Sequence, residues 1–115
     1  MATYQELIYK EIGEIIKIVQ YIEWNLLGRL KRDNFEEMTL GQIIKLIRTK
    51  KVLHITAIDE LEEILRKRND LVHSYFKRKD FEKHCNNEFF LSNELRYLEN
   101  FCDQVQKFNE WLVKN

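Results

Sequence analysis

The chain contains no proline, only 3 glycines and only 2 cysteines among its 115 residues. Because residues that break helices are scarce and Glu, Lys, Leu and Ile are abundant, the composition favours long helices over strands. Cys85 and Cys102 could pair as a disulfide, but two thiols in a small helical chain are more typical of a cytosolic protein. The length predicts one domain that spans residues 1–115.

The sequence also lacks an excess of charge of either sign and a long run of apolar residues. The 19 basic and 19 acidic residues give a formal net charge of zero, so the molecule is not a polycation that binds nucleic acid through bulk charge. Any such binding must come from a local patch. No uninterrupted apolar run approaches the length of a membrane span, and the N-terminus lacks the pattern of a signal peptide. We therefore expect a cytoplasmic protein with no membrane partner.

Apolar residues spaced three and four apart predict a long helix towards each end of the chain. Thr3 and Glu6 fit a capping box at the start of the first helix, which we expect to end near residues 31–34. The last long helix should begin near Ser92. The apolar face of the first comprises Ile8, Ile12, Ile15, Val19, Ile22, Leu26 and Leu30, and that of the last comprises Leu95, Leu98, Phe101, Cys102, Val105, Phe108 and Leu112.

The middle of the chain predicts two more helices. Thr39 and Gln42 form a second capping-box pattern, and the helix that follows should end near Lys50. Thr56 with Asp59 could cap a third long helix. Its apolar stripe comprises Ile58, Leu61, Leu65, Val72 and Phe76.

These elements, with a short helical turn over residues 80–84, predict an all-α fold. We expect an up-and-down helical bundle of three long helices plus one or two short ones, joined by short loops. The residues that should be buried include Ile12, Ile15, Val19, Leu61, Leu65, Leu98, Val105 and Leu112.

Polar side chains interrupt the apolar stripe of the third long helix. Asn69 and His73 stand one turn apart on one face, while Arg68, Val72 and Tyr75 follow a neighbouring line. Burying such groups without partners costs several kcal/mol, so they either find partners or face a cleft or an interface. The alternative is a purely structural role for these residues. Arg68 would pair with an acid on a neighbouring helix, Asn69 would donate a hydrogen bond to a loop carbonyl, and His73 would be a core histidine with hydrogen-bond partners.

The segment Arg68-Asn69-x-x-x-His73 resembles the R-x4-H signature of the HEPN superfamily, in which a polar residue commonly follows the arginine. His73-x-Tyr75 extends it to R-x4-H-x-Y, a form similar to the HEPN toxins of HEPN/MNT toxin–antitoxin pairs. The resemblance implies a helical domain that forms a homodimer and cuts RNA without a metal or another cofactor. It also implies a role as a toxin or as a component of anti-phage defence.

The resemblance assigns a role to each polar residue of the motif. Histidine readily moves protons near neutral pH, so His73 is the expected acid–base group. Arg68 would hold the phosphate and offset charge in the transition state, while Asn69 would orient the imidazole or the RNA. In HEPN/MNT pairs the tyrosine that matches Tyr75 receives AMP from a nucleotidyltransferase antitoxin. The alternative is that Tyr75 is a packing aromatic with a polar tip.

Basic residues around the motif are candidates for contacts with RNA phosphates. They are Arg66, Lys67, Lys77, Arg78 and Lys79. Together with Arg68 they face a single acid, Asp70, within residues 66–79. The alternative is an ordinary solvated face, balanced by the acidic residues one or two turns earlier in the same helix.

Other site chemistries have less support. His54, His84 and Cys85 lack the spacing of metal ligands, so no metal site is predicted. Trp24, Trp111 and the phenylalanines fall at or beside helix stripes, which favours core or dimer contacts over base-stacking platforms. Two alternatives to a ribonuclease remain: a non-catalytic HEPN-like module that binds a partner such as a nucleotidyltransferase, and a helical adaptor that matches the motif by chance.

Overall fold

The computed structural model describes residues 2–30 and 38–115, and within them the chain is helical with no strand. The all-α prediction is therefore confirmed. The helices are α1 (Tyr4–Arg29), α2 (Leu40–Lys50), α3 (Ile55–His73), α4 (Tyr75–Arg78), α5 (Phe81–His84) and α6 (Glu88–Lys114). The first helix ends at Arg29 with Leu30 as its C-cap, and residues 31–34, where we expected the end, lie outside the described residues.

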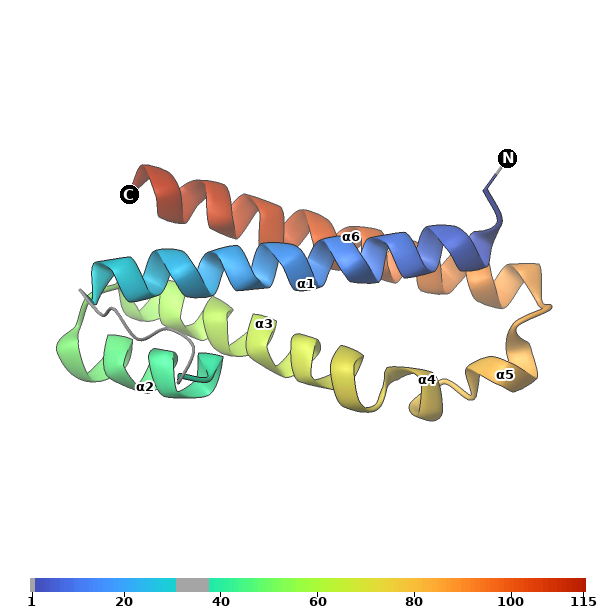
Figure 1. Cartoon of the computed structure of the whole chain (residues 1–115), viewed down its shortest axis with the longest axis horizontal. Helices are drawn as coiled ribbons and strands as arrows, with labels where there is room; N and C mark the ends of the chain where they lie inside the picture. The colour runs from blue at the N-terminus through green and yellow to red at the C-terminus, as the bar shows by residue number, and fades with distance from the viewer. Residues whose placement is uncertain (1, 31–37) are drawn as a thin grey trace.

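The three long helices α1, α3 and α6 form an up-down-up bundle (Figure 1). Helices α1 and α6 run side by side in the same direction, and α3 returns in the opposite direction with α2 packed against its first half. Asn25 of α1 donates a 2.9 Å hydrogen bond to Asn109 of α6. At the other end of α1, Gln5 donates a 2.9 Å hydrogen bond to the carbonyl of Cys85.

The core consists of the apolar faces that the helical spacing predicts. Six of the eight residues expected to be buried are buried: Ile15, Val19, Leu61, Leu98, Val105 and Leu112. Ile12 and Leu65 are only partly buried and pack against the core from its edge. Leu65 is less covered because it borders a cavity between α2 and α3, so part of its side chain faces open space.

Two helix starts follow the predicted capping pattern. The Thr3 hydroxyl accepts a hydrogen bond from the backbone N–H of Glu6. At α2 both halves of the capping box are present, since Thr39 accepts from the N–H of Gln42 and the Gln42 side chain accepts from the N–H of Thr39. These bonds satisfy backbone donors that the first turn of a helix leaves free.

Two other helix starts differ from the prediction. The N-cap of α3 is His54, not Thr56, and its Nδ1 accepts from the N–H of Thr56. Helix α6 starts at Glu88 rather than near Ser92, because the side chain of Asn87 accepts from the N–H of Phe90. In both cases a side chain upstream of the expected N-cap accepts a hydrogen bond from a free backbone N–H of the first turn.

The apolar stripe of α3 does not continue to Phe76, which corrects the prediction. Helix α3 ends at His73, and Ser74 breaks the helical path with φ near −134° and ψ near −15°. Phe76, beyond the break, is 41% exposed. Val72 still lies within α3 but is 49% exposed, whereas its neighbour Leu71 is buried. Phe76 belongs to the separate short helix α4, so the helical register carries no information across the break.

Two further findings concern membranes and thiols. Across residues 2–30 and 38–115, none of the helices has both the length and the apolar character needed to span a membrane. Cys85 and Cys102 are free thiols rather than a disulfide.

Candidate functional site

The motif residues line one cavity near the C-terminal end of α3. Arg68, Asn69 and His73 border a hollow of about 420 Å³, which Glu23 of α1 and the first residues of α2 also line. The 3.6-residue repeat of α3 places the three motif side chains on one side of the helix. The sequence thus predicted which polar side chains of α3 share a face, and the packing of α1 and α2 turns that face into a cavity wall.

Arg68 is held loosely on the cavity wall. Its Nη2 lies 4.0 Å from Oε1 of Glu23, which is too long for a hydrogen bond but close enough for an ion pair. The Arg68 Nε is buried and has no hydrogen-bond partner among the described residues. The guanidinium therefore has the acidic neighbour that the structural interpretation expected, yet keeps donors that a ligand could use.

Glu23 gives the cavity an acid whose protonation is sensitive to its surroundings. Burial raises the pKa of the Glu23 carboxyl above its ordinary value, and the positive charge of Arg68 opposes that rise. A ligand that drew Arg68 away from Glu23 would remove this opposing charge.

Asn69 and His73 are exposed, so they are open to a ligand. The exposure of His73 rules out the interpretation as a core histidine. As the last residue of α3, His73 also borders a second cavity of about 200 Å³, which follows the chain from Leu71 to Lys77. His73 thus lines two separate cavities.

Tyr75, the candidate AMP acceptor, points into the protein. The side chain is 1% exposed, and its hydroxyl donates a 2.9 Å hydrogen bond to Oε1 of Glu94. The other carboxylate oxygen of Glu94 lies 3.5 Å from Nζ of Lys79. Burial, followed by the bond to Glu94, raises the pKa of the Tyr75 hydroxyl far above its usual range. In this conformation Tyr75 is a packing aromatic whose hydroxyl is not accessible.

Three of the five basic residues proposed for RNA contacts are held by other side chains. Lys67 donates a 2.8 Å hydrogen bond to Gln104, lies 3.2 Å from Glu63 and sits over the ring of Phe101. Lys79 pairs with Glu94. Because Lys67 faces α6, it is poorly placed to contact a ligand in the motif cavity.

Arg78 makes the third such contact. Its Nε and Nη2 donate hydrogen bonds of 3.0 and 2.7 Å to the two carboxylate oxygens of Asp70. This bidentate pair joins α3 to α4 across the break at Ser74 and lowers the pKa of Asp70 below its ordinary value. Arg66 and Lys77 are exposed and form no ion pair with another described residue, so they are the free cations of the set.

Two residues of the site were missed from the sequence, and both carry a recognisable feature. Glu94 lies four residues before Leu98 and three after Leu91, in the buried face of α6. Glu23 lies four residues after Val19 and beside Ile22 in α1. A carboxylate at a position that the apolar register assigns to the core predicts a buried polar partner elsewhere in the fold.

The described residues contain no group of three or more His, Cys, Asp or Glu side chains placed to hold a metal ion. His54 caps α3, whereas His84 lies against the ring of Phe90 in α6 and Cys85 lies at the end of α5. These three residues therefore do not converge on a common point of the described structure.

Known proteins provide no family assignment for this arrangement. Comparison of the chain with models of protein families, with curated proteins and with solved structures finds no match.

Proposed function

We propose that the chain is a metal-independent endoribonuclease of the HEPN type, with Arg68, Asn69 and His73 as its catalytic residues. The observation that carries the proposal is the cavity of about 420 Å³ where these three side chains meet. An arginine with a free buried donor, an amide and an exposed imidazole on one wall are the groups that phosphate-ester chemistry needs.

The reaction proceeds by attack of the RNA's own 2′-OH on the adjacent 3′ phosphate. The new bond joins the 2′ oxygen to phosphorus, the bond to the 5′ oxygen breaks, and a 2′,3′-cyclic phosphate remains. His73 moves the protons: one is taken from the 2′-OH and one is given to the leaving 5′ oxygen. Arg68 offsets the negative charge that grows on the phosphate, and Asn69 orients the imidazole or the RNA.

The contact between Arg68 and Glu23 supports the role of Arg68 in binding. At 4.0 Å this ion pair uses little of the guanidinium's hydrogen-bonding capacity, and Nε has no partner among the described residues. A phosphate that enters the cavity can accept two parallel hydrogen bonds from Arg68, which the distant carboxylate does not.

A single chain supplies few catalytic groups, so the proposal includes a two-fold homodimer that brings a second motif to the site. The biological setting we propose is a toxin or a component of anti-phage defence, with a nucleotidyltransferase antitoxin as a candidate partner. Tyr75 stays a candidate AMP acceptor within this proposal. Because its hydroxyl is buried against Glu94, AMP transfer requires α4 to move away from α6.

A second candidate is a non-catalytic HEPN-like module that binds a partner such as a nucleotidyltransferase. One observation favours it: Lys67, Arg78 and Lys79, which an RNA-binding face would use, are held by intramolecular contacts. In this alternative the polar motif stabilises an interface and has no chemical role.

Variants of the motif test the ribonuclease directly. His73→Ala should reduce RNA cleavage by about 10²- to 10⁴-fold and Arg68→Ala by about 10²- to 10³-fold, since they serve proton transfer and charge stabilisation. Helical content by circular dichroism should be unchanged. Arg96→Ala is the charge-matched control, because Arg96 is exposed on α6 and absent from the cavity wall.

The products and the metal requirement complete the test. Cleavage should persist in EDTA and leave a 2′,3′-cyclic phosphate, which mass spectrometry of a short RNA detects. Activity that survives His73→Ala, or that EDTA abolishes, would overturn this mechanism. A wild-type protein that cleaves no RNA would favour the partner-binding module. A monomer by scattering across micromolar concentrations would remove the composite dimer site.

A further inference from the structure

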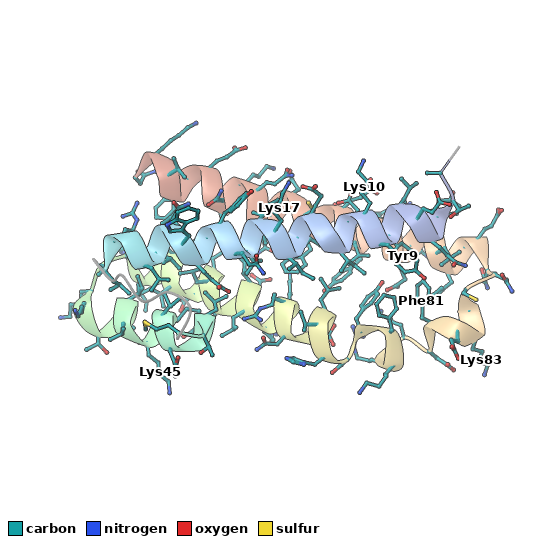
Figure 2. All side chains as sticks on the ribbon, in the orientation of Figure 1. Tyr9, Lys10, Lys17, Lys45, Phe81 and Lys83 are labelled. Carbon is teal, nitrogen blue, oxygen red and sulfur yellow. The ribbon has the colours of Figure 1, made fainter. Side chains whose placement is uncertain are left out.

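A further cavity, of about 580 Å³, lies between the start of α1 and the short helices α4 and α5. Tyr9, Phe76 and Phe81 provide its aromatic walls, and Lys77, Asp80 and Glu82 complete the lining. Figure 2 shows Tyr9 of α1 and Phe81 of α5 reaching into the space between these elements. We call this cavity the aromatic cleft.

Two of the three aromatic rings of the cleft are partly open to solvent. Phe76 and Phe81 pack edge to face with centroids 5.1 Å apart, and Tyr9 lies 6.2 and 6.4 Å from them. Phe81 is buried, but Tyr9 is 51% and Phe76 41% exposed. Rings held in place by one another yet half open to water provide a rigid stacking surface.

Shared lining residues place the aromatic cleft near the motif cavity. His73 lines both the motif cavity and the small cavity along residues 71–77. Phe76 and Lys77 line both that small cavity and the aromatic cleft. Because three residues of chain span at most about 11 Å, Phe76 lies within reach of a short oligonucleotide whose phosphate sits beside His73.

The polar lining of the cleft matches the parts of a nucleotide. Lys77 is an exposed cation without an ion-pair partner among the described residues, so it can meet a phosphate. Asp80 and Glu82 are exposed carboxylates at the rim, and carboxylates accept hydrogen bonds from the amino groups of bases. A polyanion without bases would gain nothing from the two acids or from the rings.

We infer that the aromatic cleft is a base-binding subsite for single-stranded RNA whose scissile phosphate lies in the motif cavity. An unstacked base lies against Tyr9 and Phe76, as bases of single strands do on aromatic side chains. Asp80 and Glu82 favour bases that carry an exocyclic amino group over uracil, which presents carbonyl oxygens on either side of its single N–H. This inference rests on the proposed ribonuclease and names the form of its substrate.

Binding of short oligonucleotides tests the subsite apart from catalysis. The probes are 5′-labelled 2′-O-methyl tetranucleotides of adenine, cytosine or uracil, which lack the attacking hydroxyl, with affinity read by fluorescence anisotropy on the full chain. Tyr9→Leu and Phe76→Leu keep an apolar side chain but remove the ring. Each should weaken binding of the adenine probe by about 5- to 150-fold, the range expected for the loss of one base–aromatic stack.

Matched controls keep the test specific. Tyr21→Leu removes a tyrosine of the same helix that is 48% exposed, and Phe89→Leu removes a phenylalanine that is 78% exposed; neither lines the cleft. Asp80→Asn keeps the size of the side chain and suits the left-handed backbone at Asp80, where φ is 49°. It should reduce the preference for adenine and cytosine over uracil while the fold is retained.

The outcomes separate the subsite from the ribonuclease. Weaker binding in the cleft variants supports the subsite even where wild-type protein cleaves no RNA, in which case only the catalytic proposal fails. If wild type cleaves RNA and the cleft variants bind the probes as well as the controls do, the subsite alone is overturned. Absence of probe binding by wild type overturns the subsite, and absence of RNA cleavage as well overturns both proposals. Cleft variants that turn a dimer into a monomer without altering RNA affinity per chain make the cleft a contact between copies, which also overturns the subsite.

Discussion

The hydroxyl of Tyr75 donates a 2.9 Å hydrogen bond to the carboxylate of Glu94, and both side chains are buried at 1% and 8% relative accessibility. This bond connects the short helix α4 to the long helix α6. Lys79 adds a second link from the C-cap of α4 to the same carboxylate. The segment that follows the motif is therefore held against the bundle by a largely buried polar cluster, in addition to its apolar contacts.

Tyr75→Phe should lower the free energy of unfolding by about 1–3 kcal/mol, because it leaves a buried carboxylate oxygen without its donor. Urea denaturation followed by circular dichroism measures the change. Tyr21→Phe is the control, since Tyr21 is 48% exposed. Equal effects of the two substitutions would show that the bond to Glu94 contributes nothing to stability.

RNA cleavage should survive Tyr75→Phe, whereas AMP transfer by a nucleotidyltransferase partner should not.

Arg68→Ala should raise the pKa of Glu23 further, because burial already raises it and the charge of Arg68 holds it down. Titration of the Glu23 carboxyl by NMR measures the change. A carboxyl with a raised pKa in the folded state stabilises most below its unfolded pKa, near 4.3, and loses that contribution as the pH rises. The stability of wild type relative to Glu23→Gln should therefore fall as the pH increases from about 4. A pH-independent difference would contradict this.

The pair formed by Asp70 and Arg78 should respond to pH in the opposite direction. Arg78 lowers the pKa of Asp70, so the stabilisation is present above the unfolded pKa, near 3.9, and is lost as the pH falls through the lower folded value. Because both side chains are partly exposed, the effect should be at most about 1 kcal/mol and should shrink at high salt. Urea unfolding midpoints of wild type and Asp70→Asn at pH 5 and pH 2 measure this effect. If both proteins lost equal stability between pH 5 and pH 2, the result would count against the pair.

His54→Ala should destabilise the protein by about 0.5–2 kcal/mol, because His54 Nδ1 accepts from the N–H of Thr56 at the start of α3. His54→Asn should restore most of the loss, since asparagine is a strong N-cap. Thr56→Ala, at the position first expected to cap this helix, should cost less. Thermal or urea unfolding of the three variants decides between the two caps. A larger loss for Thr56→Ala would restore the cap expected from the sequence.

The sequence by itself determined the helical class, the apolar faces of the long helices and the capping box of Thr39 with Gln42. These features depend only on the spacing of residues within one helix, so the sequence pattern is enough to predict them. The common face of Arg68, Asn69 and His73 follows from the same periodicity. The chemistry that we propose rests on this motif and on its resemblance to HEPN proteins.

Only the tertiary structure decided which partners those side chains meet. Glu23 lies beside Arg68, and Glu94 beside Tyr75, because separate helices pack together, and no spacing within one helix encodes such contacts. The sequence also did not predict that Phe76 is exposed. The helical register predicts burial only while the helix continues, and α3 ends at His73. Cavities form where several elements leave space between them, so their shape depends on packing that a single sequence does not reveal.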